Sequence, residues 1–296
     1  MRLMLADMRP AKRPFRPDRD TGGTEGLIVG RTPNMAQRED QARLATLRKA
    51  AVHCPELAAK ATDLHDRMVS AITAGEVPGT IASAECWREV CKAPVGHLWK
   101  AVEDYGSDRV ALVTLRPRDL LWEAKDLDGV SPRLLKARLR NHLDRAGVTA
   151  ASGFLFMGLD LEFDENRGRA GVWDGHWHGI VGGDKIDGLE ALRGRRAFHN
   201  ARVHPLEQGM KEQSRVLIQP RLVNLPTPIC YSLKGWACHR PSFLNEDGIR
   251  ERSKIKGRIP TPYLIRWLLW MDQWKLDDLL LRNSLNITRT GFIISP

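Results

Sequence analysis

Two apolar runs on either side of a polar turn constrain the fold of this chain more than any other feature. The first run, Phe154 to Phe163 (FLFMGLDLEF), has the length and composition of a buried strand. Residues Glu165 to Gly171 form a polar turn, and His176 to Val181 (HWHGIV) is a further strand. We predict that the two runs pair as a hairpin, because so short a turn between them favours antiparallel pairing.

The regions around this hairpin predict alternating strands and helices. Val110 to Leu115 is a β-branched run that Pro117 terminates, and a helix follows it from Ser131-Pro132 to Gly147. The order to this point is strand, helix, strand, strand. Arg215 to Val223 is expected to add a fourth strand, and Thr227 to Trp236 to begin another helix. This pattern predicts an α/β sandwich.

The two ends of the chain have a different character, and four regions are expected along its length. Residues 1–40 are rich in proline, glycine and arginine and are predicted to be a basic, disordered arm. Residues 41–105 are predicted to be helical, with a break near Pro55 and a further helix around Ala84 to Tyr105 that contains Pro94 and Gly96. Residues 106–240 hold the strands. Residues 241–296 are predicted to be a basic linker and a C-terminal helix, whose tryptophan-rich face is expected to be core.

Charge and composition limit the class of protein. The chain of 296 residues is 42% hydrophobic and carries a formal net charge of +10. Such a balance favours a polyanionic partner, with nucleic acid ahead of an anionic membrane surface. The sequence has no apolar run of about 18 residues and no signal-peptide pattern, so we expect a soluble, cytoplasmic protein with no membrane contact.

Cysteine usage agrees with a reducing compartment. The five cysteines are an odd number and form no CxxC pair, which favours reduced thiols over a disulfide framework. Cys86, Cys91 and His97 are an alternative zinc-ligand set, although the spacing of the two cysteines is poor for such a site.

Two pairs of residues in the predicted hairpin suggest a metal site. Side chains alternate along a strand, so His176 and His178 lie on one face, and Asp160 and Glu162 also share a face. If these faces coincide, two imidazoles and one carboxylate can hold a divalent cation with open positions for water or phosphate oxygens. Such a site suits Mg²⁺ or Mn²⁺, and zinc is not excluded. A solvated strand face is the alternative for whichever carboxylate does not bind.

The third chemical feature is a tyrosine in PTPICYSLKG, residues 226 to 235. In a helix Tyr231 and Lys234 are three residues apart and share a face. A nearby ammonium favours the phenolate, and it can also neutralise a phosphate. Tyrosine, lysine and metal are together the parts of a phosphodiester transesterification. The alternative for this pair is a tyrosine packed beneath the sheet and a surface lysine.

These pieces resemble the HUH endonuclease superfamily, specifically the rolling-circle replication initiator (Rep) proteins of plasmids and phages. VALVTLR at 110–116 is similar to the family's first strand motif, HWHGIV at 176–181 to its His-hydrophobic-His metal motif, and YSLK at 231–234 to its Tyr-x-x-Lys motif. The three motifs stand in the family's order and span about 125 residues. Arg116 departs from the threonine that many relatives have, and there is no second tyrosine four residues from Tyr231.

The resemblance implies an α+β fold for residues 106–240, with a ferredoxin-like antiparallel sheet and flanking helices. It also implies that Tyr231 is the nucleophile, that Lys234 assists it, and that His176 and His178 bind Mg²⁺ or Mn²⁺ together with an acid. Glu162 is our first choice for that acid and Asp160 our second. The product would be a 5′-phosphotyrosyl adduct and a free 3′-hydroxyl primer at a replication origin.

The expected partner is origin DNA that is single-stranded at the nick, with a host helicase and polymerase acting afterwards. Eight basic residues are candidates for phosphate contacts, with solvated surface charge as the alternative for each: Arg193, Arg195, Arg196, Arg240, Arg250, Arg252, Lys254 and Lys256. Three other functions remain open. They are a DNA-binding regulator that cleaves nothing, a metal-dependent hydrolase that uses water, and a single-tyrosine HUH transposase, although such transposases are usually shorter than this chain.

Overall fold

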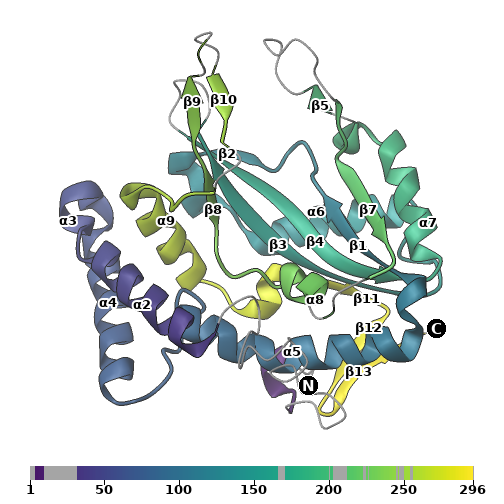
Figure 1. Cartoon of the computed structure of the whole chain (residues 1–296), viewed down its shortest axis with the longest axis horizontal. Coiled ribbons are helices and arrows are strands. Elements are labelled where there is room, and N and C mark those ends of the chain that lie inside the picture. The colour runs from purple at the N-terminus through teal and green to yellow at the C-terminus, as the bar shows by residue number, and fades with distance from the viewer. Residues whose placement is uncertain are drawn as a thin grey trace.

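A computed structural model describes most of the chain. The described residues are 4–9, 32–165, 171–199, 201–202, 212–222, 225, 227–244, 246, 250–253 and 256–295. They form a mixed sheet with helices on both of its faces (Figure 1). The α+β class that we expected is therefore observed. Lys254, one of the predicted DNA contacts, lies outside the described residues.

The sheet has the order β11-β3-β4-β1-β7, with β2 paired to β4 and β8 paired to β3. Its strands are β1 (Val110–Leu115), β2 (Leu121–Glu123), β3 (Phe154–Asp164), β4 (Val172–Gly182), β7 (Val216–Pro220), β8 (Cys238–Arg240) and β11 (Leu280–Asn283). All pairings in it are antiparallel except that of β3 with β8. The four strands expected from the sequence are thus adjacent in this sheet, and the parallel pairing was not expected.

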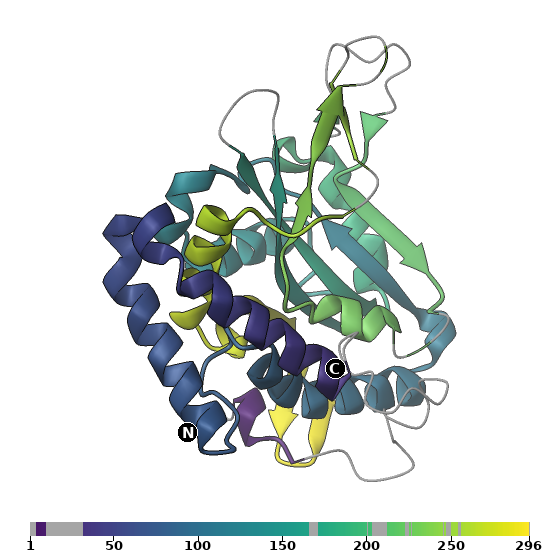
Figure 2. The same cartoon turned by 60° about the vertical axis from the view of Figure 1, so that its left-hand side comes forward.

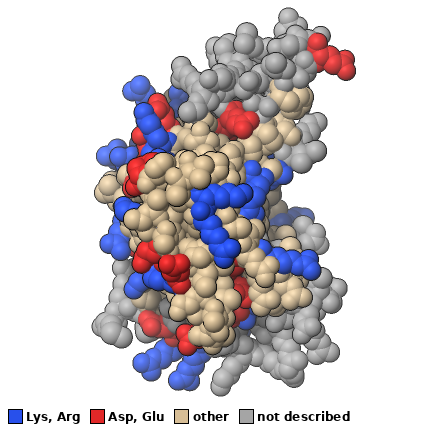
Figure 3. Space-filling view, turned by 90° about the vertical axis from the view of Figure 1, so that its left-hand side faces the viewer, with Lys and Arg blue, Asp and Glu red and all other residues tan. Residues whose placement is uncertain are grey.

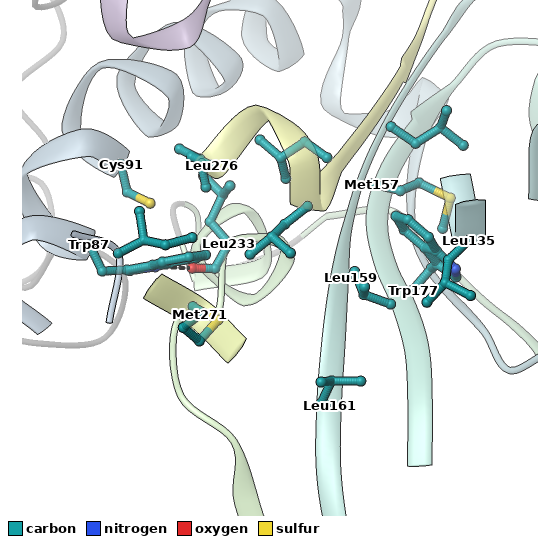
Figure 4. Packing of buried hydrophobic residues seen from close by; sticks show 14 of the residues in the cluster. Trp87, Cys91, Leu135, Met157, Leu159, Leu161, Trp177, Leu233, Met271 and Leu276 are labelled. Carbon is teal, nitrogen blue, oxygen red and sulfur yellow. Dashed lines mark hydrogen bonds between the residues drawn. The ribbon is translucent and has the colours of Figure 1, made fainter. Parts of the chain in front are cut away.

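Strands β3 and β4 form the predicted hairpin and the centre of the sheet. Their register places Asp160 opposite His176 and Gly158 opposite His178, so these four residues share one face. The other face is apolar. There Leu159 pairs with Trp177, and Figure 4 shows Trp177 close to Leu135 of the helix that covers this face. Trp177 is fully buried.

Helices surround the sheet. Their bounds are α2 (Pro33–Leu47), α3 (Ala50–His53), α4 (Ala58–Thr73), α5 (Ala84–Tyr105), α6 (Pro132–Arg145), α7 (Lys185–Glu190), α8 (Thr227–Ser232) and α9 (Thr261–Asp272). The 3-10 helices are η1 (Leu5–Asp7), η2 (Pro55–Leu57), η3 (Ser107–Arg109), η4 (Ala124–Gly129), η5 (Ala191–Gly194), η6 (Arg196–Phe198) and η7 (Leu276–Leu279). In Figure 1, α6 lies behind the sheet and the short α8 lies in front of it. Figure 2 brings α2, α4 and α9 forward as one layer beside the sheet.

The predicted N-terminal arm is wrong in part. Helix α2 begins at Pro33, where the Oγ1 of Thr32 accepts a hydrogen bond from the backbone N–H of Met35. Leu5 is also buried, although it lies within the range expected to be disordered. Helix α5 runs for 22 residues through Pro94. These are the bounds that the sequence predicted: proline removes only one donor, and the burial of this helix in the core compensates for it.

The C-terminal region contains more structure than the linker and helix that we expected. After α9 the chain adds β11 at the edge of the sheet and then the hairpin of β12 (Leu285–Thr288) and β13 (Gly291–Ile294). Two further two-stranded pairs are β5 (Ala201–Arg202) with β6 (Glu212–Gln213) and β9 (Ser242–Leu244) with β10 (Arg250–Arg252). Such short strands depend on their partners and leave little periodicity in the sequence.

One hydrophobic core joins the N-terminal helices to the sheet and to α9. The predicted tryptophan-rich face of α9 is core: Trp267, Leu268 and Met271 are buried in it, and Trp274 is partly buried against it. Trp87 of α5 donates a hydrogen bond to the carbonyl oxygen of Leu233, and Figure 4 shows this contact beside Met271. No helix among the described residues has the length and apolar character needed to cross a membrane.

Candidate active site

Three buried side chains on the central hairpin form a group that could hold a metal ion. They are Asp160 of β3 and the two histidines of β4, and one ligand atom from each lies within 4.8 Å of the others. Asp160 Oδ2 is 3.2 Å from Nε2 of His176 and 3.6 Å from Nε2 of His178. The two imidazole rings are nearly perpendicular, with centroids 4.5 Å apart. The antiparallel register brings these side chains together because all three point to the same face.

The donor set fits a divalent cation. Nε2 of His176 and Nε2 of His178 are both buried and lack a hydrogen-bond partner, since their contacts with Asp160 do not have hydrogen-bond geometry. Burial without a partner is costly for a polar atom unless a ligand satisfies it. Two imidazole nitrogens and one carboxylate are a common set for Mn²⁺, Fe²⁺ or Zn²⁺ and leave positions open for substrate.

The Nδ1 atoms of both imidazole rings contact groups of the sheet. Nδ1 of His176 is 3.3 Å from the carbonyl oxygen of Asp174, which can only accept, so Nδ1 is the donor and the neutral tautomer with this contact has its lone pair on Nε2. Nδ1 of His178 is 2.8 Å from Oγ1 of Thr114, which lies opposite it on β1. Such contacts orient ligand rings. Burial lowers the pKa of His178 to about 4, so this imidazole is neutral at pH 7.

The carboxylate in this group is Asp160, our second choice, and not Glu162. Glu162 lies two residues further along the same face of β3, opposite Asp174, and its side chain is only 1% exposed. It is held by cations: Arg240 reaches its two oxygens at 3.2 Å each, Lys256 is 3.5 Å away and Arg116 3.7 Å away. The sequence could not show which of the two acids is the ligand, because residues two apart in a strand share a face.

Lys234 lies inside the site rather than on the surface. Its Nζ is 2.5 Å from Oδ2 of Asp160, and the residue is 6% exposed. Burial by itself would raise the pKa of Asp160, but the Lys234 ammonium and the imidazoles outweigh it and hold this pKa well below the usual range. Burial would lower the pKa of Lys234, yet Asp160 raises it above its ordinary value. The pair is therefore ionised at neutral pH.

Tyr231 of α8 lies beside the metal group. Its ring centroid is 4.3 Å from that of His178, and Nζ of Lys234 is 5.9 Å from its centroid. The side chain is not enclosed, since the residue is 37% exposed. Burial raises the pKa of Tyr231 and Lys234 only partly opposes it. The phenol is thus protonated at neutral pH, and a further positive charge is needed to activate it.

A glycine in β3 lets α8 come this close to the sheet. A Cβ added at Gly158 would lie 2.0 Å from the carbonyl oxygen of Ser232, the last residue of α8. Any side chain here would push the helix away from β3. Sequence reasoning missed Gly158, because a glycine inside a strand signals a close approach of another segment without identifying it.

The segment after Tyr231 is held by the N-terminal helices. Besides donating to Leu233, the indole of Trp87 lies flat against Gly235, where a Cβ would meet the ring at 2.3 Å. The guanidinium of the buried Arg43 in α2 donates to the carbonyl oxygens of Ala82 and Gly235. These contacts join segments far apart in the sequence, and no motif indicated them.

The predicted DNA-contact residues that the structure describes lie in three places. Arg240 and Lys256 lie beside Glu162, next to the metal group. Arg193, Arg195 and Arg196 lie in or beside η5 and η6, and Arg195 donates to the carbonyl oxygen of Arg145 at the end of α6, behind the sheet. Arg250 and Arg252 belong to β10. On the face shown in Figure 3, Lys and Arg are interspersed with Asp and Glu.

The alternative zinc set does not form a site. Cys86, Cys91 and His97 all lie on α5, and they are not among the residues that gather as a possible metal group in the described part of the chain. Nε2 of His97 is 2.7 Å from the carbonyl oxygen of Arg9. Burial raises the pKa of Cys86 to about 11 and holds that of Cys91 well above its usual range, as expected for buried thiols.

No protein-family model, curated protein or solved structure matches this chain at a significant level. Its function therefore has to be inferred from the chemistry of the residues described above.

Proposed function

We propose that this protein is a metal-dependent DNA nickase that cleaves one strand by tyrosine transesterification and initiates rolling-circle replication. The observation that carries the proposal is the position of the Tyr231 ring, 4.3 Å from a ligand-type histidine in a buried Asp-His-His group. A tyrosine this close to a divalent cation site, with a lysine that contacts the carboxylate of that site, suits the transfer of a phosphoryl group to a phenol. The net charge of +10 supports a nucleic-acid substrate.

Each side chain has a distinct part in the proposed reaction. His176, His178 and Asp160 would hold Mg²⁺ or Mn²⁺, which supplies Lewis-acid polarisation of a phosphate oxygen when bound. The Tyr231 Oη attacks phosphorus and its proton leaves to solvent. The bond from phosphorus to the 3′ oxygen breaks, that oxygen takes up a proton, and the 5′ phosphate stays esterified to the tyrosine.

Lys234 is a positioning and charge-balancing residue in this proposal. Its ammonium is held by Asp160 and lies over the Tyr231 ring, 5.9 Å from the ring centroid. Its fixed positive charge opposes the rise in the pKa of the Tyr231 phenol that burial causes, and such charge stabilises the developing phenolate without reorganisation.

The test is a covalent adduct. The protein is incubated with a pool of single-stranded oligonucleotides and Mn²⁺, and a denaturing gel is examined for a protein that carries DNA. Tyr231→Phe should abolish the adduct, and His176→Ala should abolish cleavage with little loss of DNA binding. Cleavage that survives Tyr231→Phe would indicate hydrolysis by water, and binding without any cleavage would indicate a regulator.

A further inference from the structure

Three cations from separate segments meet at one buried carboxylate beside the metal group. Arg116 follows β1, Arg240 ends β8, and Lys256 lies between β10 and α9. A side-chain nitrogen of each lies within 3.7 Å of a carboxylate oxygen of Glu162. We call Arg116, Arg240 and Lys256 the Glu162 cation cluster. No pattern in the sequence placed these residues together.

Among the described residues, the cluster carries more positive charge than the acids in contact with it balance. Its three cations are matched by Glu162 and by Asp174, which is 3.2 Å from Arg116. Arg215 adds to the surplus, since it donates to the carbonyl oxygen of Arg116. The carboxylate of Glu162 is buried, whereas the cationic side chains remain 15% to 38% exposed. The buried Glu162 carboxylate thus holds three cationic side chains that are partly exposed to solvent. Such an arrangement can bind a second anion from solution.

The position of the cluster relative to the other groups follows the spacing of β3. Gly158 lies under the tyrosine helix, Asp160 belongs to the metal group, and Glu162 holds the cations. These residues are on one face at successive steps of about 6.6 Å, since a strand rises about 3.3 Å per residue. The Glu162 cation cluster is therefore on the side of the metal group away from α8.

We propose that the Glu162 cation cluster binds the phosphate next to the scissile phosphate, on the side of the leaving 3′ oxygen. The inference depends on the proposed function, because it uses the in-line relation of attacking and leaving oxygens in phosphoryl transfer. Tyr231 approaches from the α8 side, so the leaving oxygen and the strand attached to it point toward Glu162. Arg240, held at both oxygens of Glu162, and Lys256 are positioning residues for that strand.

Equilibrium binding in the absence of metal tests the subsite separately from cleavage. A labelled oligothymidylate is titrated with the full-length protein in EDTA at several salt concentrations, and fluorescence anisotropy gives the binding constant. For single strands each phosphate contact contributes about −0.7 to the slope of log K against log salt concentration. Arg240→Ala and Lys256→Ala should each weaken binding at low salt by about tenfold and reduce the slope by about 0.7.

The matched control is Arg138→Ala. Arg138 lies on α6, behind the sheet, and pairs at 3.6 Å with the exposed Asp119. It also removes one positive charge, so a general effect of net charge would lower the slope equally in all three variants. An equal effect, or unchanged binding in Arg240→Ala and Lys256→Ala, would overturn the subsite. Thermal unfolding curves verify that each variant is folded.

The adduct assay then separates the two proposals. An adduct in the wild type together with reduced slopes in the variants supports both. An adduct together with unchanged slopes supports the proposed nickase activity and contradicts the proposed subsite. Reduced slopes without any adduct retain the subsite as a phosphate-binding site and reject the nickase. If the oligonucleotide does not bind to the wild type, both are rejected.

Resealing of the nick tests on which side of the scissile phosphate the subsite lies. The fragment that ends in the 3′-hydroxyl is not covalently attached, so only non-covalent contacts retain it for the reverse reaction. Arg240→Ala should release this fragment faster than Arg138→Ala does, and should reseal a smaller fraction of the adduct that has formed. Equal release by Arg240→Ala and wild type would place the cluster on the other side of the nick and overturn the assignment.

Discussion

At the residue scale, the site depends on which of two acids faces the histidines. Asp160 and Glu162 share a face of β3, but the first meets Lys234 and the imidazoles while the second meets three cations of the surface. The two carboxylates differ in role because their neighbours differ. The alternation of side chains along a strand does not distinguish them. Asp160 is a ligand candidate, and Glu162 organises the Glu162 cation cluster.

Substitution of the two acids should therefore give different results. Asp160→Ala removes one of three ligands, and we expect Mn²⁺ binding to become undetectable by isothermal titration calorimetry. Glu162→Gln should leave Mn²⁺ affinity within a few-fold of wild type, while the loss of a buried charge with three cationic partners costs about 3 kcal/mol of stability. Loss of Mn²⁺ binding in Glu162→Gln and its retention in Asp160→Ala would reverse the assignment.

Burial of His178 also gives the metal-free protein a pH-dependent stability. Its folded pKa of about 4 lies below the ordinary histidine value of about 6.5. Between these values the unfolded chain binds a proton that the folded chain does not, so the free energy of unfolding should fall as the pH drops from about 6.5 toward 4. The full contribution is about 3 kcal/mol, since the two pKa values differ by about 2.5 units and each unit corresponds to 1.36 kcal/mol.

Urea unfolding in EDTA between pH 7 and pH 4.5 measures this contribution. His178→Gln cannot take up a proton, and its stability should fall less steeply over this range than that of the wild type. Parallel curves for the two proteins would show that His178 is not a buried neutral imidazole.

At the scale of elements, the close packing of α8 on β3 places the tyrosine. Only glycine fits at position 158, because the carbonyl oxygen of Ser232 occupies the space of a Cβ. We expect Gly158→Ala to move α8, to lower adduct formation by at least tenfold, and to cost about 1 to 3 kcal/mol as an overpacked site. Mn²⁺ binding should persist, because the three ligands lie on β3 and β4.

Gly129→Ala is the matched control for this change. Gly129 ends η4, and a Cβ there has no atom within 4 Å. The stability and activity of the Gly129→Ala variant should stay near those of the wild type. If Gly158→Ala forms the adduct as efficiently as Gly129→Ala, the close approach of α8 does not position Tyr231.

The elements themselves were predictable to different degrees. The runs at 110–115, 154–163 and 176–181 are apolar enough to be recognised as strands, and all three are central in the sheet. Strands β8 and β11 were missed, because each has three or four residues and owes its conformation to the edge of β3. The histidine pair and Tyr231 were found from local spacing, whereas Thr114, Gly158 and the cation cluster depend on pairing between distant segments.

At the scale of the whole molecule, the regions that the sequence distinguished share one core. Trp87 and Arg43 of the N-terminal helices contact the segment that carries Lys234, and α9 packs against those helices. A fragment of residues 106–240 would expose this interface and lose the support of the tyrosine segment. We expect it to show no cooperative unfolding transition and to bind no Mn²⁺. A fragment that unfolds cooperatively and binds Mn²⁺ would establish it as an independent domain.

The most direct test of the proposed mechanism is to locate the covalent bond between protein and DNA. The adduct formed with Mn²⁺ is digested with trypsin and a nuclease, and mass spectrometry identifies the peptide that carries the nucleotide. The chain has only three tyrosines, so the assignment is unambiguous. We predict that the nucleotide is attached through its 5′ phosphate to Tyr231. Attachment to Tyr105 or Tyr263, or cleavage that leaves both DNA ends free, would contradict the mechanism.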